Sequence, residues 1–192
     1  MNHLAHAVLA GDEPELIVGS LLGDFWRGAL DPMWSPALTR GVVLHRRTDS
    51  TTDRHPEVAA LRARFEPALR RYAGILLDVW FDHVLARDYE AIAGEPLAPR
   101  LGRIYAALAH VPERAPPAYA LFAQRTRAHH TLSRYADPEY VEAVYEAISA
   151  RLSRANPIAH AFPAVAALDQ PIARGFRVLW PELVAFAASL RG

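Results

Sequence analysis

Three capping residues stand directly before a proline, and this pattern constrains the fold more than any other. They are Ser35, Asp137 and Asn156, each followed by proline. Side chains of these types accept hydrogen bonds from free N–H groups at a helix start, and proline suits the first helical position. Strand-like alternation of apolar and polar residues is scarce along the chain. The sequence therefore predicts an all-α protein.

The expected helices are joined by short connections, and no Gly/Ser-rich linker divides the chain. We therefore predict a single compact multi-helix domain over residues 1–192. A chain of this length, with 52% hydrophobic residues, can bury a substantial core. The helices are expected near residues 15–30, 36–50, 56–70, 73–92, 97–110, 115–132, 138–153, 157–168 and 171–190.

Composition excludes several classes of function. The 21 basic residues balance 21 acidic ones, so no overall field favours nucleic acid or an anionic membrane. All 21 basic residues are arginine, which excludes Schiff-base lysine chemistry, and the absence of cysteine excludes thiolate metal sites and thiol nucleophiles. Neither a signal peptide nor a membrane-spanning apolar run is recognisable. We therefore expect a cytoplasmic protein with no nucleic-acid or membrane partner.

The stretch ILLDVWFDH, residues 75–83, places charged residues inside an apolar helix. Asp78 and Asp82 are four residues apart and share one face, and His83 lies at the edge of that face. A helix that is apolar on nearly all sides is usually buried. Buried carboxylates must be paired, protonated or metal-bound. Pairing with arginine and binding of a metal both remain open from this stretch alone.

A second cluster lies in GVVLHRRTDSTTDRHPE, residues 41–57. His45, Asp49 and Asp53 follow one another in steps of four and would lie along one stripe of a continuous helix. Asp53 has an alternative interpretation as a cap for the helix expected near Pro56, and His55 is best interpreted as structural. His45 and Asp49 follow an apolar run and are harder to assign to solvated surface.

Two shorter segments add the same residue types. In GSLLGDFWRG, residues 19–28, Asp24 lies between two glycines and has Arg27 three residues later, so an ion pair between them is an alternative to a site. In MNHLAHAVLA, residues 1–10, Asn2, His3 and His6 lie close together. Imidazole and carboxylate ligands suit Mn²⁺, Mg²⁺, Fe²⁺ or Zn²⁺. All-α proteins build metal centres from such inward-facing side chains.

In order and spacing, these motifs resemble those of the acyl carrier protein phosphodiesterases: MNHLAHAVLA, GSLLGDFWRG, GVVLHRRTDSTTDRHPEV and AGILLDVWFDHVLARDY. The resemblance covers residues 1–90, so the motif-bearing half is about 1–92 and the helical remainder about 93–192. It implies an HD-domain-like fold and manganese-dependent hydrolysis of the diester that joins 4'-phosphopantetheine to a serine of acyl carrier protein. The chain has Asp82-His83 where the HD enzymes have a His-Asp pair, so their ligand set cannot be copied.

The resemblance also implies roles for individual residues. The expected ligands of the divalent cation, Mn²⁺ before Mg²⁺, Fe²⁺ or Zn²⁺, are His45, Asp24, Asp78 and Asp82. The expected catalytic residues are Asp24, Arg27, Asp49, His83 and His6. The expected substrate-binding residues are Asn2, Arg46 and Arg47. Because carrier protein is acidic, we expect it to dock on arginines. The candidates are Arg62, Arg64, Arg70 and Arg71, with Arg125, Arg127 and Arg134 as a second set.

Two other functions remain open from the sequence. The same residues are compatible with a phosphohydrolase that acts on a nucleotide or another small phosphodiester. Alternatively, the chain is a non-catalytic helical protein whose aspartates and histidines only pair with arginines.

Overall fold

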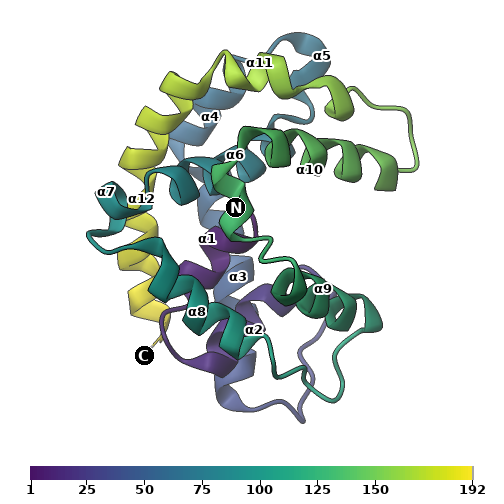
Figure 1. The fold of residues 1–192 in the computed structure, drawn as a ribbon, viewed down its shortest axis with the longest axis vertical. Helices are drawn as coiled ribbons and strands as arrows, with labels where there is room; N and C mark the ends of the chain where they lie inside the picture. Colours follow the sequence, from purple (N-terminus) through teal and green to yellow (C-terminus); the bar gives the residue numbers. More distant parts are fainter. Residues whose placement is uncertain (192) are drawn as a thin grey trace.

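The structure is a computed structural model that describes residues 1–191. Within these residues it contains helices and no strand, which confirms the all-α prediction (Figure 1). The elements are α1 (His3–Leu9), α2 (Pro14–Leu22), α3 (Pro36–Arg54), α4 (Pro56–Ala63), α5 (Pro67–Arg70), α6 (Ala73–Arg87), α7 (Tyr89–Ala93), α8 (Leu97–Ala107), α9 (Pro117–Ala128), η1 (Ser133–Ala136), α10 (Pro138–Arg151), η2 (Ile158–His160), α11 (Phe162–Ala166) and α12 (Asp169–Arg191).

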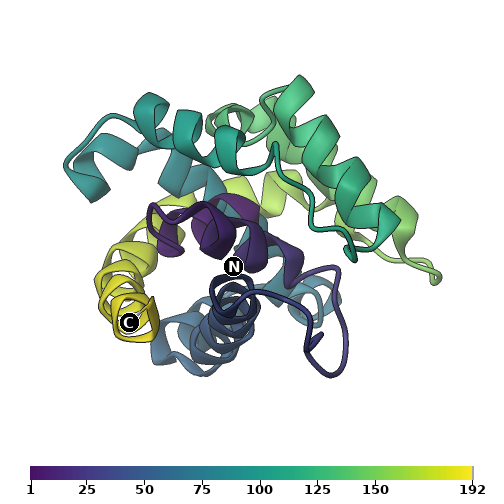
Figure 2. The ribbon, with the colours of Figure 1, turned by 90° about the horizontal axis from the view of Figure 1, so that it is seen from below.

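Helices α1 and α6 lie in the interior of the molecule. All residues of α1 from Leu4 to Leu9 are buried, and so is most of α6. Figures 1 and 2 show α1 near the centre, with α3 on one side and later helices around it. One hydrophobic cluster connects the start of the chain to α12. The polar side chains of His6, Asp82 and His83 on these two helices are therefore enclosed by a continuous core.

Glycine brings α2 and α3 into close contact. A Cβ atom on Gly41 would lie 2.5 Å from the carbonyl oxygen of Leu16 and 2.7 Å from the amide nitrogen of Ser20. Gly19 lies on the opposite side of the same contact. Only glycine permits this approach, because any side chain would force the two backbones apart. The contact fixes the distance between α2 and α3, and α3 carries His45.

The Ser–Pro and Asp–Pro signals are confirmed, and the Asn–Pro signal is weaker than expected. Ser35 Oγ accepts a hydrogen bond from the amide of Leu38 at 3.1 Å, and Asp137 accepts one from Glu139 at 3.0 Å. Asn156 accepts from the amide of Ile158, yet it opens only the short 3₁₀ turn η2, and α11 begins separately. The expected helix 157–168 is therefore two short elements.

Several other boundaries differ from those expected. The helix expected over 15–30 ends at Leu22, and the helix expected over 56–70 is interrupted before Pro67. Proline lacks an amide proton and disfavours the helical conformation of the residue before it, which explains the second break. The helix expected over 73–92 divides at Asp88 into α6 and α7. The seven-residue helix α1 was not among the expected helices.

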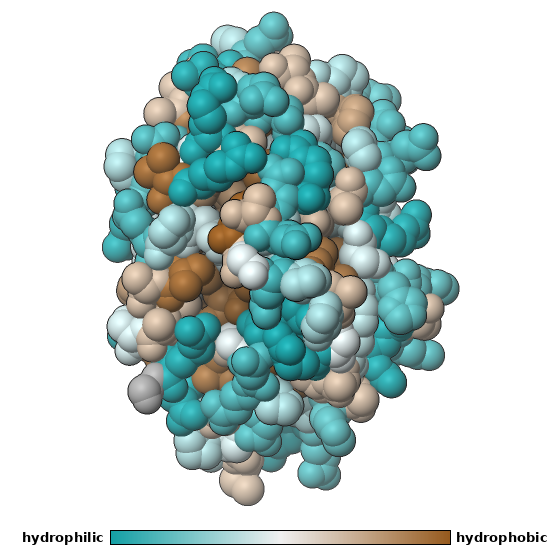
Figure 3. Space-filling model, turned by 60° about the vertical axis from the view of Figure 1, so that its left-hand side comes forward, coloured by the Kyte–Doolittle hydropathy of each residue, from teal (hydrophilic) through white to brown (hydrophobic). Residues whose placement is uncertain are grey.

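The described helices include none that is long and apolar enough to cross a lipid bilayer. Hydrophilic side chains cover most of the face shown in Figure 3, and hydrophobic side chains appear there only in small areas. The large hydrophobic residues that are exposed are scattered over several elements: Met33, Val111, Leu121, Leu152, Val178 and Val184.

Candidate active site

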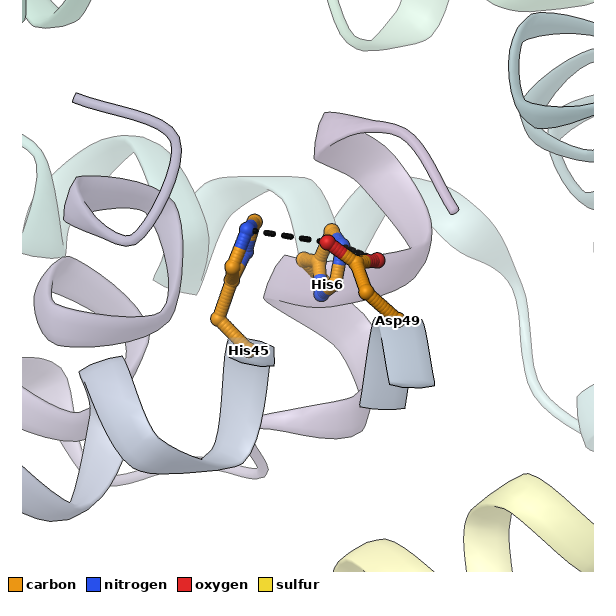
Figure 4. Close-up of side chains that lie close together, drawn as sticks. All are labelled: His6, His45 and Asp49. Atoms are coloured by element: carbon orange, nitrogen blue, oxygen red, sulfur yellow. Dashed lines mark hydrogen bonds and ion pairs between the residues drawn. The ribbon is translucent and has the colours of Figure 1, made fainter. Parts of the chain in front are cut away.

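Two buried histidines and one aspartate converge between α1 and α3. His6 Nε2 lies 3.0 Å from Asp49 Oδ1, and His45 Nε2 lies 3.2 Å from Asp49 Oδ2 (Figure 4). One ligand atom from each residue lies within 4.8 Å of the others. The two imidazoles are almost fully buried, whereas the Asp49 side chain is 39% exposed. The two imidazoles of the cluster are therefore buried, and the cluster is accessible to solvent on the side of Asp49.

Local sequence explains how each member reaches this place. His45 and Asp49 are four residues apart on α3, so they share one face of that helix. Gly23 follows the last residue of α2 and packs against the His45 ring, where a Cβ atom would lie 2.5 Å from Cδ2. Because Gly23 has no side chain, the ring occupies this space.

Asp82 fixes the third member, His6. Its carboxylate accepts hydrogen bonds from the amides of Leu4 and Ala5, at 2.7 and 3.0 Å. These amides belong to the first turn of α1, where N–H groups have no partner within the helix. The side chain of Asp82 thus supports a short helix and orients it so that His6 points to α3.

Asp24 and His3 extend the cluster toward solvent. His3 Nε2 lies 3.2 Å from Asp24 Oδ2, and His45 Nε2 lies 3.5 Å from Asp24 Oδ1. The Asp24 side chain is 41% exposed. Within residues 1–191, Asp24 makes no ion pair with Arg27, so the alternative of a local Asp–Arg pair is wrong.

The electrostatics of the cluster favour a neutral His6 and ionised carboxylates at Asp24 and Asp49. Burial, together with the charge of the neighbouring His45, lowers the pKa of His6 to about 4. Burial alone would raise the pKa of Asp49, but hydrogen bonds from His45 and His6 outweigh it and hold that pKa far below its usual range. The pKa of Asp24 is also lowered, because the hydrogen bond and charge of His3 outweigh the effect of burial.

The donor set fits a divalent cation. Two imidazole nitrogens and one carboxylate are the ligands that Mn²⁺, Fe²⁺ and Zn²⁺ share in proteins. The Nδ1 atoms of His6 and His45 are buried and have no hydrogen-bond partner among residues 1–191, whereas the Nε2 atom of each ring faces the Asp49 carboxylate. Neutral rings and an ionised carboxylate are the protonation states that metal binding requires.

The two aspartates of α6, Asp78 and Asp82, were expected as metal ligands but make other contacts. Asp78 contacts the α-amino group of Met1 at 2.9 Å, and the same amino group lies 3.3 Å from Asp49. Burial raises the pKa of Asp78, and the amino group opposes this effect. Asp82, expected as a ligand, instead uses both carboxylate oxygens on α1, and burial raises its pKa to about 7.

His83, expected as a catalytic residue, has other neighbours. Its Nδ1 atom lies 2.8 Å from the carbonyl oxygen of Tyr135, and its Nε2 atom lies 3.3 Å from Arg87. Burial lowers its pKa. These contacts tie η1 to α6, so the structure does not bring His83 into the His6–His45–Asp49 cluster.

Of the arginines and the asparagine expected to contact substrate, some are exposed and others already hydrogen-bond within the protein. Arg46 donates to the carbonyl oxygens of Gly28 and Trp26 at 3.0 and 2.9 Å and so supports the loop after α2. Arg27 and Arg47 are exposed. Asn2 donates to the hydroxyl of Tyr135 at 2.9 Å, next to His3.

The first set of candidate docking arginines includes two with internal roles. Arg62 pairs with Asp53, and Arg70 donates to the carbonyl oxygens of Phe65 and Ala63 at the end of α4. Asp53 therefore forms an ion pair, whereas His55 caps α4 by accepting from the amide of Glu57. Arg64 and Arg71 are exposed.

A cleft of about 800 Å³ opens beside the cluster. Its wall includes Asn2, His3 and Asp24 from the first part of the chain, and its other lining residues come mainly from 118–151. In residues 93–192 the sequence predicted docking arginines, Arg125 among them, but no catalytic or metal-binding residue. The cleft residues of α9 and α10 carry no motif, so only the packing of these helices reveals them.

The chain matches the family model described as acyl carrier protein phosphodiesterase over residues 1–183. Proteins named acyl carrier protein phosphodiesterase from Salmonella agona (strain SL483), Salmonella newport (strain SL254) and Salmonella heidelberg (strain SL476) are each 31% identical to it over 189 residues, which is 98% of this chain and 98% of each relative. No solved structure matches the chain. The match reaches well beyond the motif-bearing first half, and the chain therefore belongs to the acyl carrier protein phosphodiesterase family.

Proposed function

We propose that this chain is a metal-dependent phosphodiesterase that hydrolyses the diester between 4'-phosphopantetheine and a serine of acyl carrier protein. The products are apo-carrier protein and free 4'-phosphopantetheine. The observation that carries the proposal is the His6–His45–Asp49 cluster, which opens through Asp24 and His3 into a cleft. Family membership supports the choice of substrate.

In this proposal His6, His45 and Asp49 hold the cation, and Asp24, beside His45, completes its ligands. Mn²⁺ is the favoured ion, and Mg²⁺, Fe²⁺ and Zn²⁺ are the alternatives. A divalent cation supplies polarisation of a phosphoryl oxygen and compensates its negative charge. Asp78 lies beside the amino group of Met1, which also contacts Asp49, and so contributes to the charge balance of the ligand set.

Hydrolysis forms a bond between a water oxygen and phosphorus and breaks the bond between phosphorus and the serine oxygen. The water loses one proton, and the serine oxygen gains one. In this proposal His3, whose Nε2 atom lies 3.2 Å from Asp24, carries this proton. Asp82 and His83 act as positioning residues in this scheme, since they hold α1 and η1 in place.

Exposed arginines are proposed to compensate the negative charge of the substrate. Arg27 and Arg47 are accessible, while Arg46 positions the loop that carries Trp26. We further propose that residues 1–192 act as one unit, in which the first half supplies the cluster and the remainder supplies most of the cleft wall. Gly192 lies outside the described residues.

The test is release of 4'-phosphopantetheine from holo-carrier protein with Mn²⁺, followed by mass spectrometry of the carrier protein. His45→Ala and Asp49→Ala should abolish release, and His160→Ala, which removes an exposed histidine of η2, should not affect it. A panel of nucleotides serves as competing substrates. Hydrolysis of nucleotides with untouched holo-carrier protein would overturn the proposed substrate. Full activity of both cluster variants would overturn the proposed site.

A further inference from the structure

The cleft beside the His6–His45–Asp49 cluster is lined mainly by apolar side chains beyond its His3–Asp24 end. Asn2, His3 and Asp24 line one part of it, and Phe25 lies next to them. Apolar side chains of α9 and α10 line the rest: Leu121, Phe122, Val144 and Ile148. The rings of His3 and Phe122 contact each other in a tilted arrangement with centroids 4.5 Å apart, which joins the two parts. Figure 1 shows α9 and α10 on the same side of the molecule, on either side of the chain start.

Polar side chains also line the cleft. Thr126 and Thr131 supply hydroxyl groups, and Tyr140 supplies a phenol. Arg125 and Arg151 are the only charged lining residues away from His3 and Asp24 within residues 1–191. The cleft therefore combines apolar contact with a few hydrogen-bonding groups, and its described lining residues include no carboxylate beyond Asp24 to repel an anionic partner.

These features match one part of the substrate. Beyond its phosphate, 4'-phosphopantetheine carries a carbon with two methyl groups, a hydroxyl group, two amides and a terminal thiol. The dimethyl segment requires apolar contact close to the phosphate, and the amides require spaced donors and acceptors. A pocket of about 800 Å³ is also in the range that holds a ligand of this size.

We propose that the α9–α10 cleft holds the pantetheine arm of the carrier protein, with the phosphodiester at the His3–Asp24 end and the thiol toward α10. This inference rests on the proposed function and adds to it a binding site for the arm. Phe122, Val144 and Ile148 contact the aliphatic part of the arm. Arg125 and Arg151 lie where they can face the acidic carrier protein that stays outside the cleft.

The test uses a substitution that narrows the cleft and lies outside the His6–His45–Asp49 cluster. Ala147 lies on α10 and lines the cleft, so Ala147→Trp places an indole in the path of the arm. Ala150→Trp is the matched control, because Ala150 is exposed on α10 but is not a lining residue. Two quantities are measured for both variants: kcat/KM with holo-carrier protein, and binding of pantetheine itself by ligand-observed NMR. Mn²⁺ binding reports an intact cluster.

Ala147→Trp is expected to lower kcat/KM by about tenfold or more and to abolish pantetheine binding, while Mn²⁺ binding stays unchanged. Ala150→Trp is expected to behave as the unmodified protein. Equal kcat/KM values and equal pantetheine binding in the two variants would overturn the inference and leave the proposed function standing.

The NMR measurement also separates failure of the inference from failure of the proposed function. If neither the variants nor the unmodified protein hydrolyse holo-carrier protein, the proposed reaction is wrong. Pantetheine binding that is lost only in Ala147→Trp would then still support the cleft as a pantetheine site. Absence of pantetheine binding to an unmodified protein that does hydrolyse holo-carrier protein would overturn the inference alone.

Discussion

The imidazole rings of His6 and His45 lie 3.9 Å apart between their centroids and are inclined by only 29°. Both rings are buried, and one comes from α1 and the other from α3. Two protonated rings at this distance would repel each other strongly in a medium from which water is excluded. The two ring nitrogens that face Asp49 and the carboxylate itself form a donor set of the size that one cation needs.

Mn²⁺ should stabilise the folded chain through this arrangement. A cation at about one hundred times its dissociation constant adds roughly 2.7 kcal/mol to the free energy of unfolding. For a chain of this length that corresponds to a rise in Tm of roughly 5–10 °C. Thermal unfolding with Mn²⁺ and with a chelator measures the difference. His6→Ala should remove it, and a full shift in that variant would place the cation elsewhere.

Gly23→Ala should weaken cation binding although position 23 offers no ligand. The backbone of Gly23 has helical angles, so alanine causes no backbone strain there. The new methyl group would meet the His45 ring, 2.5 Å from Cδ2 and 2.7 Å from Cβ, and force the ring to turn. Isothermal titration with Mn²⁺ should show an affinity lower by about tenfold or more.

Gly102→Ala is the control for that substitution. Gly102 is an exposed residue of α8, and a methyl group added there would meet no neighbouring atom within 4 Å. Alanine at an exposed helical position should raise the free energy of unfolding by about 0.5–1 kcal/mol. Its Mn²⁺ affinity should equal that of the unmodified protein. Equal loss of affinity in both variants would show that packing of the His45 ring is not the cause.

Asp82 should make stability depend on pH. Burial raises its pKa from 3.8 to about 7, so between these values the folded chain binds more protons than the unfolded chain. The free energy of unfolding must then fall as pH rises through this window. Relative to Asp82→Asn, the unmodified protein should lose roughly 2–3 kcal/mol between about pH 5 and pH 8. Urea unfolding of both proteins at the two pH values measures this, and parallel pH profiles would contradict it.

Carrier protein should approach the molecule from the side of α9. Arg125 is exposed and lines the cleft, so Arg125→Glu should raise KM for holo-carrier protein by about tenfold at low salt, with a smaller effect at high salt. Arg64→Glu tests the α4–α5 surface that the sequence predicted, since Arg64 is also exposed. If Arg64→Glu alone raises KM, the carrier protein docks on α4–α5 instead.

The fold was predictable where a helix carries its own signals. Ser35 and Asp137 mark helix starts by local hydrogen bonds, and these do not depend on the rest of the chain. Helix α1 gives no such signal: its N-cap, Asn2, makes no side-chain capping bond, and its first turn is satisfied by Asp82, far along the sequence. A helix whose partner lies on another element cannot be recognised from its own residues.

The sequence predicted which residue types form the candidate site, but it predicted less well which of these residues come together. His45 was expected as a ligand and Asp49 and His6 as catalytic residues, and the structure brings these three together. Asp82 was expected beside them because it shares a helix face with Asp78, yet the packing of α1 takes up its carboxylate. Spacing along one helix cannot say which neighbouring helix a side chain will meet. The expected relation to the HD-domain enzymes stays a prediction.

The dependence of α1 on Asp82 has a consequence for synthesis of the protein. His45 and Asp49 lie on α3, but the first turn of α1, next to His6, gains the Asp82 carboxylate as its partner only after α6 has left the ribosome. A nascent chain that ends before α6 would lack this support for α1. In the function proposed here, cation binding should therefore follow translation of the first half of the chain.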